Sequence, residues 1–389
     1  MRRCRVSGMV MVLLGGLSVA AKADSVTMPS APPAGLSQDH PFQDWVVACD
    51  NVRRCEAQGY PTQESDDPPV MLRLRRDAGP DAPARLSLVW GNLTADPRQK
   101  PPPQPRAGQP LTLKAGTLTF SWPVPAGYVA GGDVALPVDQ GGPLLAAMRQ
   151  ADALVLTQGA LRWRISLKGA SAALLKIDDL QGRVGTVGAL ARPGPQAEDR
   201  VPVAPALPQI DAVRIPASVK TPEGLKASLL KAVLALPAVG ERCDRMHPEN
   251  LDAKALLAST EVWPLSDSQV MVTLPCWLAA YNGGSAAWVA HIKPPHVLKD
   301  VRFAALPAEG AGRGRAWAWE DSASDLTLKR QSDGVLLASA MAKGRGDCVS
   351  RSRWVWNGQA FVLLDSELSA CKFFSSGGEP LRLWRAQVR

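Results

Sequence analysis

Short runs of alternating apolar and polar residues dominate the first half of the chain. Five of them, each bounded by Gly, Pro or Asp, are DWVVACD, VMLRLRR, ARLSLVW, LTLKAGTLTFSW and LRWRISL. Alternation with a period of two places one face of a strand against a core and the other toward solvent. The Ala115-Gly116 step between LTLK and TLTF indicates a hairpin. We therefore predict half-buried strands over residues 41–191, forming a sandwich-like domain.

Two segments of this domain have helical spacing instead. They are GPLLAAMRQ near 142–150 and SAALLKIDDL near 171–180. In the second segment Leu174 and Ile177 recur at helical intervals, and Ser171 is a residue type that favours the N-cap position. The first domain is therefore expected to be a β-rich body that carries two helices.

The second half begins with a pattern typical of a helix. Thr221 is a good N-cap, and Pro222 follows in the first turn, where its missing N–H costs nothing. Leu225, Leu229 and Val233 then share one face. A shorter helix is expected after this one, in the stretch PENLDAKALLA.

Beyond these helices the pattern is again that of strands. Runs such as SQVMVTLPCWLAAY, AAWVAHIK, GVLLASAMAK and SRWVWNGQAFVLL alternate or are strongly apolar. Asn357-Gly358 lies between two of them and predicts a hairpin with a type I′ turn. Residues 216–389 are therefore predicted to form an antiparallel meander opened by helices. The fold class as a whole is mainly β with a few helices (α+β).

Proline-rich segments mark the boundaries between these parts. RPGPQAEDRVPVAPALP opens the segment 192–215, and prolines spaced through small residues make a semi-rigid spacer that cannot build a core. We predict a linker there, between β-rich domains over 41–191 and 216–389. Residues 24–40 lack periodicity and are expected to form a flexible leader.

Residues 1–23 have the three parts of a secretory signal peptide. Three arginines within the first five residues precede the apolar stretch GMVMVLLGGLSVAA, and AKA ends at Ala23 in the form that signal peptidase cuts. The apolar stretch is shorter than the roughly 20 residues that cross a bilayer, and no later uncharged segment reaches that length. We expect cleavage near Ala23 and a soluble mature chain without an integral membrane segment, located in the periplasm or secreted.

Charge adds little to this picture. Removal of residues 1–23, which carry four basic and no acidic side chains, lowers the formal net charge from +8 to +4. A nucleic-acid-binding protein would show a clustered basic face, and an exported chain has little contact with nucleic acid. We therefore expect no nucleic-acid partner.

Six cysteines follow the predicted signal peptide. They permit many pairings, and the simplest joins neighbours along the chain: Cys49 with Cys55, Cys243 with Cys276, and Cys348 with Cys371. Disulfides persist in oxidising compartments, in agreement with export. Redox or metal chemistry is the alternative, but the chain has no C-x-x-C motif and no histidine at zinc-ligand spacing from the cysteines. We expect no metal and no cofactor.

Two groups of residues are candidates for a binding site. Asp44, Trp45, Asp50 and Asn51 flank the Cys49–Cys55 loop, where two carboxylates could face a ligand. The alternative is that Trp45 lies in the core and that Asp50-Asn51 forms a turn by bonding its own backbone.

The second candidate is a group of tryptophans in the last third of the chain: Trp317, Trp319, Trp354 and Trp356. Residues two apart on a strand lie on one face, so these rings could form an aromatic platform that stacks on sugar rings. Such a face is more often covered by another sheet, because tryptophan brings a large apolar area. The platform is kept as the possible binding surface.

Catalytic motifs give no assignment. The G-x-S-x-G elbow, the H-E-x-x-H helix and the S-x-x-K motif are absent in usable form. A hydrolase that acts on glycan or peptidoglycan through carboxylates distant in sequence remains the alternative function. The sequence leaves open whether the protein is an enzyme and favours a non-catalytic role, and it identifies no catalytic residue.

Four segments resemble a known family. They are FQDWVVACDNVRRCEAQGY at 42–60, ISLKGASAALLKIDDLQGRVGTVGAL at 165–190, LPCWLAAYN at 274–282 and GDCVSRSRWVWNGQAFVLL at 346–364. They are similar to exported bacterial proteins catalogued as domain of unknown function 1176. The first segment also resembles the start of invasion-associated locus B proteins. The resemblance implies an exported envelope protein with internal disulfides and no established reaction. Our leading hypothesis is a protein that binds an envelope component or a protein partner, and a secreted factor at a host surface is a third possibility.

Overall fold

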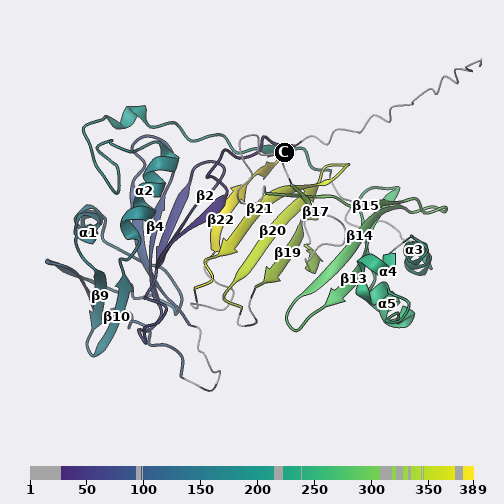
Figure 1. Ribbon diagram of the computed structural model, residues 1–389, viewed down its shortest axis with the longest axis horizontal. Helices are drawn as coiled ribbons and strands as arrows, with labels where there is room; N and C mark the ends of the chain where they lie inside the picture. Colours follow the sequence, from purple (N-terminus) through teal and green to yellow (C-terminus); the bar gives the residue numbers. More distant parts are fainter. Residues whose placement is uncertain are drawn as a thin grey trace, which may run out of the picture.

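The computed structural model describes residues 28–92, 98, 100–213, 222–237, 239–306, 318–320, 327–331, 334–342, 344, 346–372 and 380–389. Its β-sheets lie side by side in a row along the longest axis, with α2 near one end and α3, α4 and α5 at the other (Figure 1). The protein is mainly β with a few helices, as predicted.

Two antiparallel sheets form the N-terminal part. The six-stranded sheet has the order β1 (Gln38–Phe42), β2 (Trp45–Cys49), β3 (Cys55–Gly59), β4 (Val70–Arg76), β5 (Ala84–Trp90), β8 (Val134–Ala135). The four-stranded sheet has the order β10 (Leu161–Ser166), β9 (Ala153–Gln158), β6 (Pro110–Ala115), β7 (Leu118–Pro123). The short helices are η1 (Val138–Gln140) and α1 (Gly141–Met148), and the longer helix is α2 (Ala170–Gln181).

The predicted helices of this part are present, but the start of α2 differs from the prediction. Its N-cap is Gly169 rather than Ser171, with a φ of 94° and no side-chain cap. A Cβ at this position would overlap the carbonyl group of Phe42, so only glycine fits. The local backbone packing, and not a capping side chain, fixes where the helix begins.

The six-stranded sheet is buried on both faces. One face packs with α2 and the four-stranded sheet around a core that contains Trp45, Val47 and Leu72. The other face packs Val46 and Met71 against the C-terminal strand β22 (Pro380–Arg385). The prediction of half-buried strands is therefore wrong for β2, where every residue is buried. Its apolar run WVVAC is typical of a strand that is covered on both sides.

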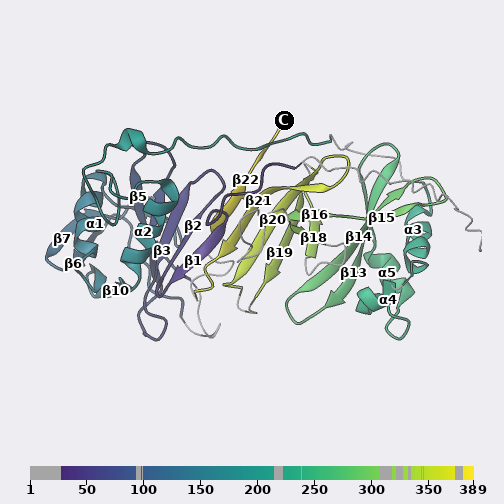
Figure 2. The same cartoon turned by 45° about the horizontal axis from the view of Figure 1, so that its top comes forward.

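Residues 192–213 run along both parts of the molecule (Figure 2). Near its start, η2 (Glu198–Arg200) lies against the N-terminal part, and Val201 is buried. Near its end, β11 (Gln209–Ile210) pairs in parallel with β23 (Gln387–Val388). These contacts hold the proline-rich segment along the molecule.

Two further sheets form the C-terminal part. One has the order β12 (Glu261–Pro264), β13 (Gln269–Leu278), β14 (Gly283–His291), β15 (Leu298–Asp300). The other is seven-stranded, with the order β17 (Ala318–Glu320), β16 (Phe303–Ala305), β21 (Phe361–Ser369), β20 (Val349–Trp356), β19 (Leu336–Met341), β18 (Thr327–Arg330), and with β22 beside β21. The helices are α3 (Leu225–Leu234), α4 (Val239–Arg242), η3 (Asp244–Met246) and α5 (Ala253–Ser259).

The sheet of β12 to β15 separates two cores. Val270 and Val272 face α3, α4 and α5, whereas Met271 faces the seven-stranded sheet. The predicted helical face of Leu225, Leu229 and Val233 is buried in the first of these cores. Helix α3 begins after Gly224, which has a φ of 76°. The predicted cap Thr221 lies outside the described residues.

The predicted hairpin at Asn357-Gly358 joins β20 to β21, with a turn that differs from type I′. Trp356 pairs with Phe361, so the connection has four residues rather than two. The side-chain oxygen of Asn357 accepts the N–H groups of Gln359 at 3.0 Å and Ala360 at 2.9 Å. The asparagine acts through its side chain, and Gly358 alone of the pair has a positive φ.

All three predicted disulfides are present. They join Cys49 to Cys55, Cys243 to Cys276 and Cys348 to Cys371. Among the helices of the described residues, none combines the length and the apolar character that a membrane crossing needs.

Candidate ligand-binding groove

The structure places two tryptophans of the predicted platform, Trp354 and Trp356, inside the protein. Trp354 and Trp356 are 1% and 4% exposed, and they lie in the core between the two C-terminal sheets. The indole N–H of Trp354 donates to the carbonyl of Ala304 at 2.7 Å. These two rings therefore do not form an open surface, because the sheet of β12 to β15 covers them. Trp319 belongs to β17, and Trp317 lies outside the described residues.

The residues beside the first disulfide hold two parts of the molecule together. One carboxylate oxygen of Asp50 accepts the N–H groups of Val52 and Arg54 at 3.0 and 2.9 Å, which makes the expected turn. The other oxygen accepts from Nε of Arg385 at 2.7 Å. The carboxamide of Asn51 bonds both the N–H and the carbonyl of Arg385, at 2.8 and 2.9 Å. Burial raises the pKa of Asp50, although Arg385 and the N–H groups oppose the rise.

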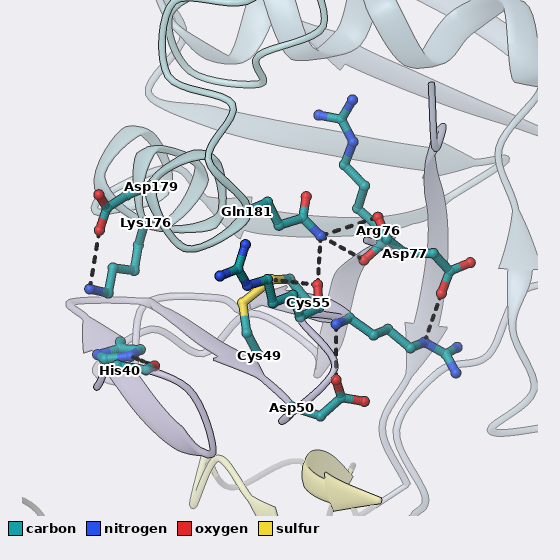
Figure 3. The surroundings of a disulfide bond; sticks show 12 residues. His40, Cys49, Asp50, Cys55, Arg76, Asp77, Lys176, Asp179 and Gln181 are labelled. Atoms are coloured by element: carbon teal, nitrogen blue, oxygen red, sulfur yellow. Dashed lines mark hydrogen bonds and ion pairs between the residues drawn. A yellow bond between two sulfur atoms is a disulfide. The ribbon is translucent and has the colours of Figure 1, made fainter. Parts of the chain in front are cut away.

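Helix α2 fastens the same turn from the other side (Figure 3). The side-chain N–H2 group of Gln181 donates to the carbonyls of Arg53, Arg76 and Asp77 at 2.9, 3.2 and 3.2 Å. Trp45 is fully buried and donates to the carbonyl of Ser166 at 2.8 Å. The Cys49–Cys55 loop is therefore a docking element, and its polar groups are already engaged.

One polar pair was not anticipated from the sequence. His296 Nε2 lies 2.7 Å from the hydroxyl of Ser228 on α3, and its Nδ1 lies 2.9 Å from the carbonyl of His291. Both bonds are solvent-exposed, and neither side chain lines the groove described next. The pair fastens the loop after β14 to α3. Among the described residues, no cluster of three or more His, Cys, Asp or Glu side chains could hold a metal ion.

A groove of about 770 Å³ follows the hairpin of β13 and β14 and is bounded by η3 and β12 and by β18, β19 and β20. This volume lies within the ~300–1,000 Å³ typical of ligand pockets. Its charged, aromatic and hydroxyl-bearing lining residues are Arg245, Ser259, Glu261, Thr273, Trp277, Tyr281, Ser285, Lys329, Ser339 and Arg351.

The groove forms where the inner face of the hairpin changes from apolar to polar. Met271 and Ala287 lie in the core between the two C-terminal sheets. Further toward the hairpin tip, the same face carries Thr273, then Pro275 opposite Ser285. These small or polar side chains cannot continue the apolar core. The two sheets therefore enclose a groove at this end.

Two aromatic residues near the hairpin tip line the groove, each beside a glycine. Trp277 is opposite Gly284 across the hairpin, and a Cβ at Gly284 would overlap its indole ring. Tyr281 is 45% exposed, and a Cβ at Gly344 would lie 3.2 Å from its ring. The β-bulge between Pro275 and Trp277 changes the direction of the indole relative to a regular strand. The absence of a side chain at both glycines leaves room for the neighbouring ring.

An asparagine fixes the hairpin tip to the neighbouring sheet. The carboxamide of Asn282 donates to the carbonyl of Met341 at 2.6 Å and accepts from its N–H at 2.9 Å. The side chain of Asn282 thus bonds the backbone of Met341 as a neighbouring strand would. These two bonds join the two walls of the groove.

A family model matches most of the chain. The model of the family described as "Protein of unknown function (DUF1176)" matches residues 39–387. The chain belongs to the DUF1176 family. It is 28% identical over 335 residues to the "Uncharacterized protein YpfG" of Escherichia coli (strain K12), a match that covers 83% of this chain and 85% of that protein.

Among solved structures, the crystal structure of invasion associated protein b from Bartonella henselae is similar over 37% of this chain and 99% of that chain. The identity is 17% and the TM-score is 0.27. A likeness of this size supports no argument about function.

Two of the disulfides of this DUF1176 protein hold the walls of the groove. Cys243 precedes Arg245 on η3, and its bond to Cys276 ties that segment to β13 between two lining residues. Cys348 follows a lining glycine and precedes β20, and its bond to Cys371 fixes the end of β21. The elements around the groove are therefore fastened covalently. This reduces the conformational entropy that the protein loses when a ligand binds.

Proposed function

We propose that this DUF1176 protein is an exported protein of the cell envelope that binds an envelope component in the groove. Three disulfides fit an oxidising compartment. The observation that carries the proposal is the groove itself. It is fixed by disulfides and by Asn282, and it offers Trp277 and Tyr281 together with several hydroxyl and basic groups. Aromatic and polar groups that converge in a preformed cavity are typical of ligand sites.

Binding has more support than hydrolysis at this site. Glycoside hydrolysis generally uses two carboxyl groups placed on either side of the bond that breaks. Glu261 supplies the one carboxylate among the described residues that line the groove. The scattered-carboxylate hydrolase therefore has no matching pair there.

A direct test uses the purified mature chain, residues 24–389. Soluble peptidoglycan fragments and oligosaccharides of the outer leaflet are titrated while tryptophan fluorescence and calorimetric heat are followed. We expect Trp277→Ala to abolish binding. The matched control is Phe120→Ala, because Phe120 is also partly buried but packs against the N-terminal core. Equal binding by both variants would move the site elsewhere, and absence of binding by the wild-type protein would remove the proposal.

Export is tested separately. Cell fractionation is expected to find the protein outside the cytoplasm, and mass spectrometry is expected to give a mature N-terminus near Asp24. An intact N-terminus on cytoplasmic protein would contradict the proposed location.

A further inference from the structure

We propose that the ligand of the groove is an anionic glycan, that is, a sugar chain that carries carboxylate or phosphate groups. This inference rests on the proposed function, and it adds the chemical class of the ligand. Three properties of the groove support it: a surplus of basic side chains, hydroxyl groups along its walls, and two aromatic rings.

The basic side chains outnumber the acidic ones. Arg245, Lys329 and Arg351 line the groove, and Glu261 is the acidic residue among the described lining residues. Arg351 forms an ion pair with Glu367 at 3.6 Å, which offsets part of its charge. In the part of the chain that the structure describes, no ion pair joins Arg245 or Lys329 to a carboxylate. The groove therefore keeps positive charge available for an anion.

Other cations of the seven-stranded sheet face carboxylates. On the neighbouring strands, Arg353 lies 3.6 Å from Asp365, and Arg382 lies 3.5 Å from Asp365 and 3.8 Å from Glu367. Cations there are balanced by carboxylates on the next strand. Arg245 and Lys329 instead lie where the surface is hollowed, so a ligand in the groove can contact both.

The remaining lining groups favour a sugar chain over an acidic peptide. Ser259, Thr273, Ser285 and Ser339 are among the lining residues, and a hydroxyl both donates and accepts hydrogen bonds, as sugar hydroxyls do. The hydroxyl of Ser259 donates to the carbonyl of Ala255 at 2.7 Å, so it is left to accept from a ligand. Aromatic faces accept the C–H faces of sugar rings by stacking. Guanidinium and ammonium groups bind carboxylate and phosphate by charge-assisted hydrogen bonds. An acidic peptide would use the basic groups but would not need the hydroxyl groups and rings together.

The test compares two sugars with the same backbone. One is a peptide-free tetrasaccharide of alternating N-acetylglucosamine and N-acetylmuramic acid, which carries lactyl carboxylates. The other is fully N-acetylated chitotetraose, which is neutral. Hexaglutamate represents the acidic peptide, and a phosphorylated core oligosaccharide represents the phosphate case. Affinity is measured by calorimetry on the full mature chain at low and raised salt.

We expect at least one of the two anionic sugars to bind more tightly than chitotetraose, and raised salt to weaken that binding. Arg245→Gln and Lys329→Gln are each expected to weaken it about tenfold or more, as for the loss of a charged hydrogen bond. Lys114→Gln is the matched control, since Lys114 is exposed on β6 in the other sheet system. Thermal unfolding of each variant checks that the fold is retained.

The outcomes separate this inference from the proposed function. Equal binding of chitotetraose, unaffected by the charge variants, would leave the proposed function standing and overturn the anionic class. Hexaglutamate that binds as tightly as the anionic sugars, and loses affinity in the same variants, would overturn the glycan class. If none of the four probes binds, this inference fails, and the proposed function then depends on the wider ligand panel and on Trp277→Ala.

Discussion

At the scale of single residues, the most buried charges of the protein neutralise one another. The guanidinium of Arg183 is fully buried and pairs with Glu198, and Arg76 lies nearby. Burial and the charge of Arg183 lower the pKa of Arg76 to about 10. Burial raises the pKa of Glu198, but hydrogen bonds from Thr186 and Gly188 and the two guanidinium groups outweigh it, and the net pKa is lowered. This cluster attaches η2 to the N-terminal core.

Replacement of this carboxylate should destabilise the fold in a pH-dependent way. Glu198→Gln removes the carboxylate that pairs with Arg183 and lies 3.9 Å from Arg76, although the charge of Asp178 still acts on both guanidinium groups. The loss of one partner of a buried ion pair costs about 3–5 kcal/mol. Because the folded-state pKa of Glu198 is lowered, its stabilising contribution is present above the unfolded pKa of about 4.3 and is lost as pH falls through the folded pKa. Urea denaturation of both proteins at pH 7 and in the acid range measures the difference.

We expect the free energy of unfolding of the wild-type protein to exceed that of Glu198→Gln by a large amount at pH 7 and by a smaller amount in acid. Glu249→Gln is the control, since Glu249 is exposed. A difference that stays constant from neutral to acid pH would show that the charge of Glu198 is not the source of its effect.

Residue identity predicted some of these roles and missed others. Asp50 was expected to form a turn from its residue type, and it does so through its own backbone neighbours. Its second bond, to Arg385, joins residues more than 300 positions apart, and no local pattern contains that information. The same holds for Trp354, whose burial depends on a sheet that folds over it.

At the scale of elements, two asparagine side chains attach a turn of one sheet to a strand of another. Asn282 bonds both backbone groups of Met341, and Asn51 bonds both backbone groups of Arg385. In each case a turn is fixed to a strand of a different sheet. The carboxamide suits this role because it carries a donor and an acceptor side by side.

Removal of one such side chain should loosen the groove. Asn282→Ala leaves the N–H and carbonyl of Met341 without their partner, and an unsatisfied polar group costs about 1–3 kcal/mol. We expect faster amide exchange at Met341 and weaker ligand binding, with a modest loss of stability. Asn250→Ala is the control for amide exchange, because the side chain of Asn250 bonds to Asp244 near the surface and not to Met341. Unchanged exchange at Met341 would contradict the role of Asn282.

The disulfides should separate stability from binding. By the chain-entropy relation, loss of Cys243–Cys276 costs about 3.5 kcal/mol and loss of Cys49–Cys55 about 2 kcal/mol. Replacement of both Cys243 and Cys276 by serine should also lower ligand affinity, because their bond positions Arg245 beside β13. Replacement of both Cys49 and Cys55 by serine should leave ligand affinity unchanged. Calorimetric unfolding and ligand titration of both double variants measure the two effects.

Equal loss of affinity in both double variants would show that the disulfides act on binding only through overall stability. Affinity that is unchanged in both would show that the Cys243–Cys276 bond does not position the groove.

Element types were predictable because they depend on local patterns. Period-two runs and Asn357-Gly358 identified strands and a hairpin, and the apolar spacing of α3 identified its buried face. The groove was not predictable in the same way. Trp277 and Tyr281 were part of the segment LPCWLAAYN, but their shared cavity depends on the bulge at Pro275 and on contact with β18 to β20. The change from Met271 to Thr273 on one strand face is the sequence signal that could have indicated it.

At the scale of the whole molecule, the last long strand joins the two halves. Leu381 and Leu383 of β22 pack against Val46 and Met71 on the outer face of the six-stranded sheet. The proline-rich composition of 192–215 predicted a linker between separate domains. The division into two domains stays a prediction. The contacts of β22 show that the two halves share a buried apolar surface. Such a surface couples their stability.

This coupling can be weakened without a change in either core. Asn51→Ala removes both bonds to the backbone of Arg385 and leaves Asp50 and Cys49–Cys55 in place. We expect the wild-type protein to unfold in one calorimetric transition and the variant to unfold about 1–3 kcal/mol more easily. Because the lost bonds connect the halves, the variant transition should broaden or split. Asn250→Ala, which affects only local bonds, should keep the wild-type profile. A single, unshifted transition in Asn51→Ala would mean that the apolar contacts of β22 couple the halves without the asparagine.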